Sequence, residues 1–136
     1  MRFFVPGDPV GKQRPRVANG HAYTPSKTKD YENTVALFCK NAMHKDGYKR
    51  VEHGPVEVEI IIWYRVPKSV SKAKQTAMLH GDMMPLNRPD IDNVVKAVLD
   101  AINGIAYRDD AQVVKLSASK AYAENPGVFV GVFGGD

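Results

Sequence analysis

The feature that most constrains the fold is the segment of residues 91–102, which has strong helical periodicity. Its apolar side chains recur at intervals of three and four residues, which places them on one face of an α-helix. Pro89 and Asp90 suit the start of a helix, and Asn103-Gly104 suits its end. The segment therefore predicts a helix that buries one face. The apolar positions are Ile91, Val94, Val95, Val98, Leu99 and Ile102.

Aspartates flank this predicted helix. Asp90 and Asp92 open it, and the pair Asp109-Asp110 follows its end. The connection over residues 103–110 is long enough to return to the helix start, because each extended residue spans about 3.3 Å. Three carboxylates at one place repel one another unless a cation neutralises them, and a hard cation such as Mg²⁺ is the usual solution. Asp90, Asp92 and Asp110 are therefore candidate metal ligands.

Lys96 adds a cation to this set. It lies one helical turn after Asp92, so its ammonium can reach the same place. Carboxylates, a divalent metal and a lysine form a recurrent device for hydrolysing phosphodiesters. The combination predicts phosphodiester chemistry at the start of the helix.

Each of these residues also has an explanation without chemistry. Asp90 can cap the helix, and Asp92 can offset the helix dipole. The pair Asp109-Asp110 is an ordinary turn composition before a strand. Lys96 can form a surface ion pair with Asp92 or Asp100, worth about 0.2–0.5 kcal/mol. Spacing alone leaves both explanations open.

The stretch from Arg88 to Val113 resembles the signature of the RusA family of Holliday-junction resolvases. The resemblance rests on Arg88-Pro-Asp-Ile-Asp-Asn, Lys96, Asp100, Asn103-Gly104 and Asp109-Asp110-Ala-Gln-Val. It implies that Asp90, Asp92 and Asp110 are the acidic metal-site residues and that Lys96 is the family's helical lysine. It further implies a Mg²⁺-dependent endodeoxyribonuclease that resolves four-way junctions by paired symmetric nicks and leaves 5′-phosphate ends. A homodimer is also implied, since its two-fold symmetry would match that of the junction.

Basic residues concentrate in the first part of the chain. Residues 1–50 hold ten Lys and Arg against four Asp and Glu, whereas residues 51–136 hold nine against eleven. A basic part beside an acidic cluster suits a polyanion held over a metal site. The net charge of +4 is by itself common among proteins that bind no nucleic acid.

The basic run leads into a predicted hairpin. Asn19-Gly20 predicts a tight turn between strands near residues 14–17 and 21–23. Lys12, Arg14 and Arg16 alternate, so they project from one side of an extended chain, and we interpret them as DNA phosphate contacts. The run also resembles phage-like members of the family. The alternative is an edge strand kept soluble by charge.

Arg88 is a fourth candidate DNA contact, because it directly precedes the acidic motif. Its guanidinium could touch a phosphate there, and it could equally pair with Asp90. We therefore expect Lys12, Arg14, Arg16 and Arg88 to form the DNA-binding set.

The remaining pattern predicts an α+β fold in one domain over residues 1–136, with a mixed or antiparallel sheet of about five strands and about three helices. Further strands are expected at 2–5, 56–66, 112–122 and 128–133, the last two forming a hairpin. Further helices are expected from Thr24-Pro25 to about residue 43 and from Ser69 or Ser71 to about residue 79. The predicted core is Phe4, Val35, Phe38, Val58, Ile60, Ile62, Val94, Val98, Leu99, Ile102, Val113 and Val130.

Composition excludes several classes of protein. No apolar run approaches the roughly 20 residues that span a bilayer, and the N-terminus lacks a secretory signal. The lone Cys39 excludes an internal disulfide and suits a reducing cytoplasm. Zinc-ligand spacing, a glycine-rich phosphate loop and a nucleophile elbow are all absent from the sequence.

Two other functions remain open from the residues. One is a DNA-binding module without chemistry, in which the acidic cluster is structural. The other is a metal-dependent hydrolase of a smaller phosphate ester. An Asp92→Asn variant tests the first, and a comparison of four-way junctions with free nucleotides tests the second.

Overall fold

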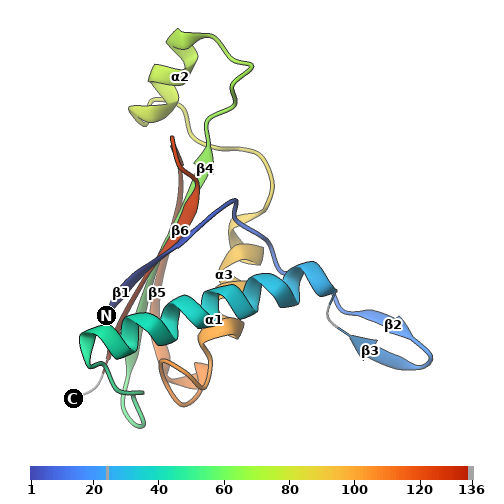
Figure 1. Ribbon diagram of the computed structural model, residues 1–136, viewed down its shortest axis with the longest axis vertical. Coiled ribbons are helices and arrows are strands. Elements are labelled where there is room, and N and C mark those ends of the chain that lie inside the picture. Colours follow the sequence, from blue (N-terminus) through green and yellow to red (C-terminus); the bar gives the residue numbers. More distant parts are fainter. Residues whose placement is uncertain (24, 135–136) are drawn as a thin grey trace.

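The sheet is built around β4 (Val56–Arg65), which has a partner strand on each side. β6 (Gly127–Gly134) pairs with it antiparallel, and β5 (Val113–Ala123) pairs with it parallel. β1 (Arg2–Pro6) completes the order β1-β6-β4-β5 by pairing with β6. This computed structural model describes residues 1–23 and 25–134. The expected α+β fold is confirmed, with a four-stranded mixed sheet, a two-stranded ribbon and three helices (Figure 1).

The core lies against one face of this sheet. Alternate side chains of β4 are buried, because successive residues of a strand point to opposite faces. Three valines of β6 are buried in register beside them. The buried residues of the two strands are Val56, Val58, Ile60, Ile62 and Tyr64, with Val128, Val130 and Val132.

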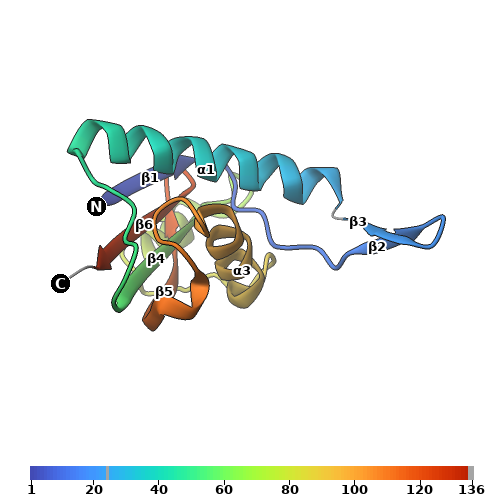
Figure 2. The same ribbon diagram turned by 90° about the horizontal axis from the view of Figure 1, so that it is seen from below.

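Two helices supply most of the rest of the core, and Phe3, Val5, Val51, Ala106 and Tyr107 complete it. α1 (Ser26–Asp46) and α3 (Ile91–Ile102) lie on the same side of the sheet (Figures 1 and 2). α3 has the bounds that the periodicity predicts. α1 ends at Asp46, three residues beyond the predicted end, because the following Gly47 adopts the left-handed conformation with φ of 64°. The predicted capping residue Thr24 lies outside the described residues.

α2 (Lys72–Leu79) is peripheral, as its weak apolar pattern predicts. Ser71 begins it and accepts a hydrogen bond from the backbone N–H of Lys74. The helix lies past the end of β4, away from α1 (Figure 1). None of the described helices combines the length and the hydropathy that crossing a membrane requires.

The predicted hairpin forms a separate ribbon. β2 (Arg16–Ala18) and β3 (His21–Tyr23) pair antiparallel around Asn19-Gly20, whose φ values of 52° and 76° are those of a tight hairpin turn. All six strand residues are exposed. The ribbon projects past the start of α1 (Figures 1 and 2).

Two expectations about the sheet are wrong. β5 and β6 form no hairpin, because β4 lies between them and pairs with both. The chain passes from β4 through α2 and α3 before it returns as β5, and such a crossover makes β5 parallel to β4. The apolar β6 then takes the other edge of β4.

The second error concerns which side chains of β1 face the core. Phe4 is 42% exposed, whereas Phe3 and Val5 are buried, so the expected inward face is displaced by one residue. Of the other predicted core residues, Phe38, Leu99 and Val113 are partly buried against the core. The rest are fully buried: Val35, Val58, Ile60, Ile62, Val94, Val98, Ile102 and Val130.

Candidate active site

The first part of the site is the start of α3. Asp90 occupies the N-cap position, but its side chain makes no capping hydrogen bond. Asp92 lies in the first turn and is exposed. Among the described residues, neither carboxylate takes part in an ion pair. The helix therefore leaves the Asp90 carboxylate free of the capping role that its position suggests.

Tyr64 supports the chain just before Asp90. Its hydroxyl donates a hydrogen bond to the carbonyl of Pro89. The ammonium of Lys120 donates to the carbonyl of Asn87 at 2.9 Å and lies 4.7 Å from the centre of the Tyr64 ring. Burial, and then the charge of Asp90, raises the pKa of Tyr64 to about 12, so its hydroxyl remains a donor near neutral pH. Sequence reasoning missed both supporting residues, since no local signal marks them.

The second part of the site is the connection between α3 and β5. Asp110 begins a short 3-10 turn, η1 (Asp110–Gln112). Its backbone N–H donates to Asn103 Oδ1 at 3.1 Å, and its Oδ1 accepts from the Tyr107 hydroxyl at 2.6 Å. Burial, and then the hydrogen bond to Asp110, raises the pKa of Tyr107, which keeps that hydroxyl protonated. Asp109 is exposed, whereas Asp110 is half-buried.

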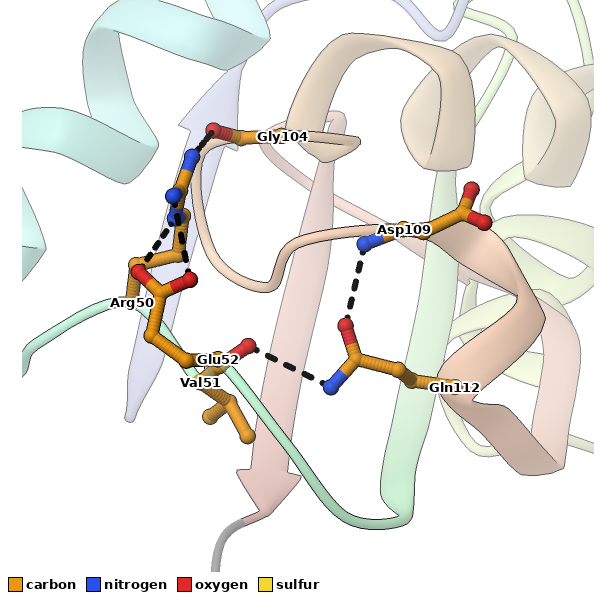
Figure 3. A network of polar contacts seen from close by, with 6 residues as sticks. All are labelled: Arg50, Val51, Glu52, Gly104, Asp109 and Gln112. Atoms are coloured by element: carbon orange, nitrogen blue, oxygen red, sulfur yellow. Dashed lines mark hydrogen bonds and ion pairs between the residues drawn. The ribbon is translucent and has the colours of Figure 1, made fainter.

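Gln112 links the connection between α3 and β5 to the segment before β4 by hydrogen bonds (Figure 3). Its Nε2 donates to the carbonyls of Val51 and Gly54, at 3.3 and 3.1 Å. Its Oε1 accepts from the backbone N–H of Asp109 at 3.0 Å. The side chain thus sets the backbone position next to Asp110. Its place in the motif is visible in the sequence, but its structural role is not.

Arg50 makes a second link between the same two segments (Figure 3). Its guanidinium donates to the carbonyl of Gly104 at 3.2 Å and pairs with Glu52 at 2.8 Å. The turn after α3 is therefore held on both sides, which limits where Asp110 can lie.

An acidic hollow of about 400 Å³ lies between α3 and β5. Asp92 and Asp110 both line it, so the turn after α3 does return toward the start of that helix. Lys96 lines it too, 4.0 Å from Asp100. The remaining lining is apolar: Ile91, Val95, Leu99, Leu116 and Ala118.

A basic hollow of about 640 Å³ is also lined by Asp92. Here Asp90 and Asp92 lie with the basic run that precedes β2. The four predicted DNA contacts line it together: Lys12, Arg14, Arg16 and Arg88. Residues 12–16 and 88–92 are far apart in the chain, and the fold brings their opposite charges to one place.

Lys12 differs from the three arginines because its charge is already paired. Its Nζ lies 2.5 Å from Glu32 Oε1 on α1 and 3.2 Å from Asp100 Oδ2 on α3. Burial lowers the pKa of Lys12, but the hydrogen bonds to the two carboxylates more than offset this, so its pKa is raised. Its backbone N–H also donates to the carbonyl of Asn93 at 2.8 Å. Lys12 therefore ties the N-terminal segment to both helices.

Comparison with known proteins gives the site its context. The family model described as endodeoxyribonuclease RusA matches residues 6–132. This chain belongs to the RusA family. It is also 40% identical, over 136 residues, to the uncharacterized protein YqaN of Bacillus subtilis (strain 168), with 96% of this chain and 93% of that protein covered. The resemblance inferred from the sequence is confirmed, and with it the enzyme class of an endodeoxyribonuclease.

Nucleases of the RusA family are typically metal-dependent, so the acidic residues need to suit a metal ion. Within residues 1–23 and 25–134, no three acidic, histidine or cysteine side chains are grouped closely enough to hold one. Asp92 instead lines one hollow with Asp90 and the other with Asp110. Mg²⁺ is usually held by one or two carboxylates with water and substrate phosphate oxygens, so the donors fit such an ion.

Proposed function

We propose that this protein is a Mg²⁺-dependent endonuclease that resolves four-way DNA junctions by paired symmetric nicks. Membership of the RusA family supports cleavage of branched DNA. The observation that carries the proposal furthest is that Asp92 lines both hollows, one with Asp110 and Lys96 and the other with Asp90 and the arginines. A DNA backbone neutralised by the arginines would then lie beside the carboxylates.

We assign roles to the residues of the two hollows as follows. Arg14, Arg16 and Arg88 bind phosphates and set the position of the strand. Lys96 places positive charge where negative charge develops on the phosphate under attack. The products are 5′-phosphate and 3′-hydroxyl ends.

Asp90, Asp92 and Asp110 are the proposed metal ligands. Because the three are not grouped closely enough in the described residues to hold one ion together, an ion would take one or two of these carboxylates and complete its shell with water and phosphate oxygens. A divalent cation bound there would lower the pKa of a water and offset charge on the phosphate. The role of these residues is to supply hard oxygen donors.

The decisive experiment compares wild type with Asp92→Asn on a synthetic mobile four-way junction, with Mg²⁺ and with chelator. We expect Mg²⁺-dependent paired nicks from wild type, loss of cleavage by at least about 100-fold in the variant, and retained or tighter junction binding. Asp82→Asn is the matched control, because Asp82 is an exposed loop aspartate outside both hollows. Equal cleavage by Asp92→Asn and wild type would contradict the assignment.

The same assay separates the two rival functions. A DNA-binding module without chemistry would bind the junction and never cut it at any Mg²⁺ concentration. A hydrolase of smaller phosphate esters would turn over free nucleotides faster than junctions. We expect neither result, because Arg14 and Arg16 of the basic run and Arg88 before α3 line one hollow, where they can bind successive phosphates of a DNA strand.

A homodimer is part of the proposal, since two symmetric nicks in one junction require two active sites. Light scattering on the free protein should then give twice the chain mass of 15.0 kDa. If only one chain of 15.0 kDa were bound to each junction, paired nicking by one dimer would be contradicted. We place the protein in the cytoplasm, where its buried Cys39 would stay reduced.

A further inference from the structure

Tyr107 stands out in the turn that carries Asp110. It is fully buried, whereas the next two residues, Arg108 and Asp109, are exposed. Its hydroxyl donates to Asp110 Oδ1 at 2.6 Å, a short bond of the kind that a carboxylate acceptor makes. The sequence motif marks Asp110 as a site residue but gives no sign of this contact.

The backbone around Tyr107 is fixed on both sides. The N–H of Val51 donates to the carbonyl of Ala106, and the N–H of Arg108 donates to the carbonyl of Val51, both at 3.1 Å. Tyr107 itself forms isolated bridges with Val51 and Asn103. Because the backbone is held and the ring is enclosed in the core, the hydroxyl has a fixed position.

The hydroxyl of Tyr107 is more than a packing group. Two other tyrosines, Tyr31 and Tyr48, bury hydroxyls for which no hydrogen-bond partner exists among the described residues. Unlike these two, the Tyr107 hydroxyl is directed at a side chain of the described residues, the carboxylate of Asp110. The backbone N–H of Asp110 is already bound to Asn103. The bond from Tyr107 therefore acts on the orientation of the Asp110 carboxylate.

We propose that Tyr107 is a positioning residue that fixes the Asp110 carboxylate by binding one oxygen and leaving the other for the cation. The inference rests on the proposed function, because it assumes that Asp110 is a metal ligand. Hydrogen bonds from neighbouring residues to metal ligands hold the ligands in place, and their loss commonly weakens metal binding by about 10–100-fold. The second carboxylate oxygen of Asp110 would bind the cation in the acidic hollow, which Asp110 lines with Asp92.

The test is Tyr107→Phe, which keeps the ring and removes the donor. We expect Mn²⁺ binding to the DNA-free protein, measured by calorimetry, to weaken by about 10–100-fold. The Mg²⁺ concentration for half-maximal junction cleavage should rise by a similar factor, while junction binding in chelator stays unchanged. Tyr48→Phe is the matched control, because it removes a buried hydroxyl without a partner and should change none of these.

A second pair of variants separates positioning from folding. Replacement of Tyr107 by p-aminophenylalanine keeps a donor at the same place and should restore Mn²⁺ binding. Replacement by p-methylphenylalanine fills the same volume without a donor and should not restore it. Equal Mn²⁺ binding by these two variants would overturn the proposal.

The outcome also distinguishes this inference from the proposed function. If Asp92→Asn abolishes Mn²⁺ binding and Tyr107→Phe leaves it within about twofold of wild type, the metal site stands and the positioning role is wrong. If wild type binds no Mn²⁺, the metal site fails and the positioning role fails with it. In an Asp110→Asn background, Tyr107→Phe should cause no further loss of binding.

Discussion

At the scale of single residues, Lys12 and Arg14 both belong to the alternating basic run, but their surroundings in the structure differ. Lys12 is held by Glu32 and Asp100, whereas Arg14 is exposed at the basic hollow. We expect Lys12→Met to lower the free energy of unfolding by about 1–3 kcal/mol, because it leaves the half-buried Glu32 without its cation and Asp100 with Lys96 alone. Urea denaturation measures this.

The salt dependence of junction binding then separates the two residues. Each lost phosphate contact reduces the slope of log affinity against log salt by about 1. We expect Arg14→Met to reduce the slope and Lys12→Met to leave it unchanged. A reduced slope for Lys12→Met, with unfolding free energy as in wild type, would show that Lys12 contacts DNA after all.

At the scale of elements, the β2–β3 ribbon is separable from the rest of the fold. All of its strand residues are exposed, so it contributes no side chain to the core. We expect replacement of residues 16–23 by a short Gly-Ser linker to change the free energy of unfolding by no more than about 0.5 kcal/mol. Junction affinity should fall, because the deletion removes Arg16, a proposed phosphate contact, and the exposed His21 and Tyr23, which can contact sugar or base.

The control for this deletion is Arg16→Ser in the intact ribbon. We expect it to lose less affinity than the deletion, since Tyr23 remains, 48% exposed and free to contact sugar or base. Gel-shift titrations on one junction at fixed salt compare the two. Equal affinity of the deletion variant and wild type would remove the ribbon from the proposed interface.

At the scale of the whole molecule, buried tyrosines link stability to pH. Burial raises the pKa of Tyr31, Tyr64 and Tyr107 above the ordinary value of 10.0, to about 12 for Tyr64. The unfolded chain therefore loses these protons at lower pH than the folded chain. The free energy of unfolding is unaffected by them below about pH 10 and falls as pH rises beyond it.

Tyr64→Phe tests this linkage. The variant removes one of the groups whose pKa the fold raises, so its unfolding free energy should fall less steeply between about pH 10 and pH 12 than that of wild type. Urea denaturation at several alkaline pH values measures both slopes. Identical slopes would mean that Tyr64 ionises alike in the folded and unfolded chains.

The site itself was predictable to the extent that its signals are local. The motif names Asp90, Asp92, Lys96 and Asp110, and the structure places Asp92 in one hollow with Lys96 and Asp110 and in another with Asp90. Tyr64 and Gln112 could not be predicted in the same way. They act by bonds to backbone carbonyls of other segments, and such partners leave no periodic pattern in the chain.

The sequence by itself determined α3 and the turn at Asn19-Gly20, because helical periodicity and turn chemistry are properties of neighbouring residues. Only the tertiary structure decided that β5 pairs with β4, that Phe3 rather than Phe4 faces inward, and that Lys12 binds two carboxylates. The physical reason is that these outcomes depend on which distant segments share the core. A shift of one residue in a strand exchanges its two faces without changing its composition.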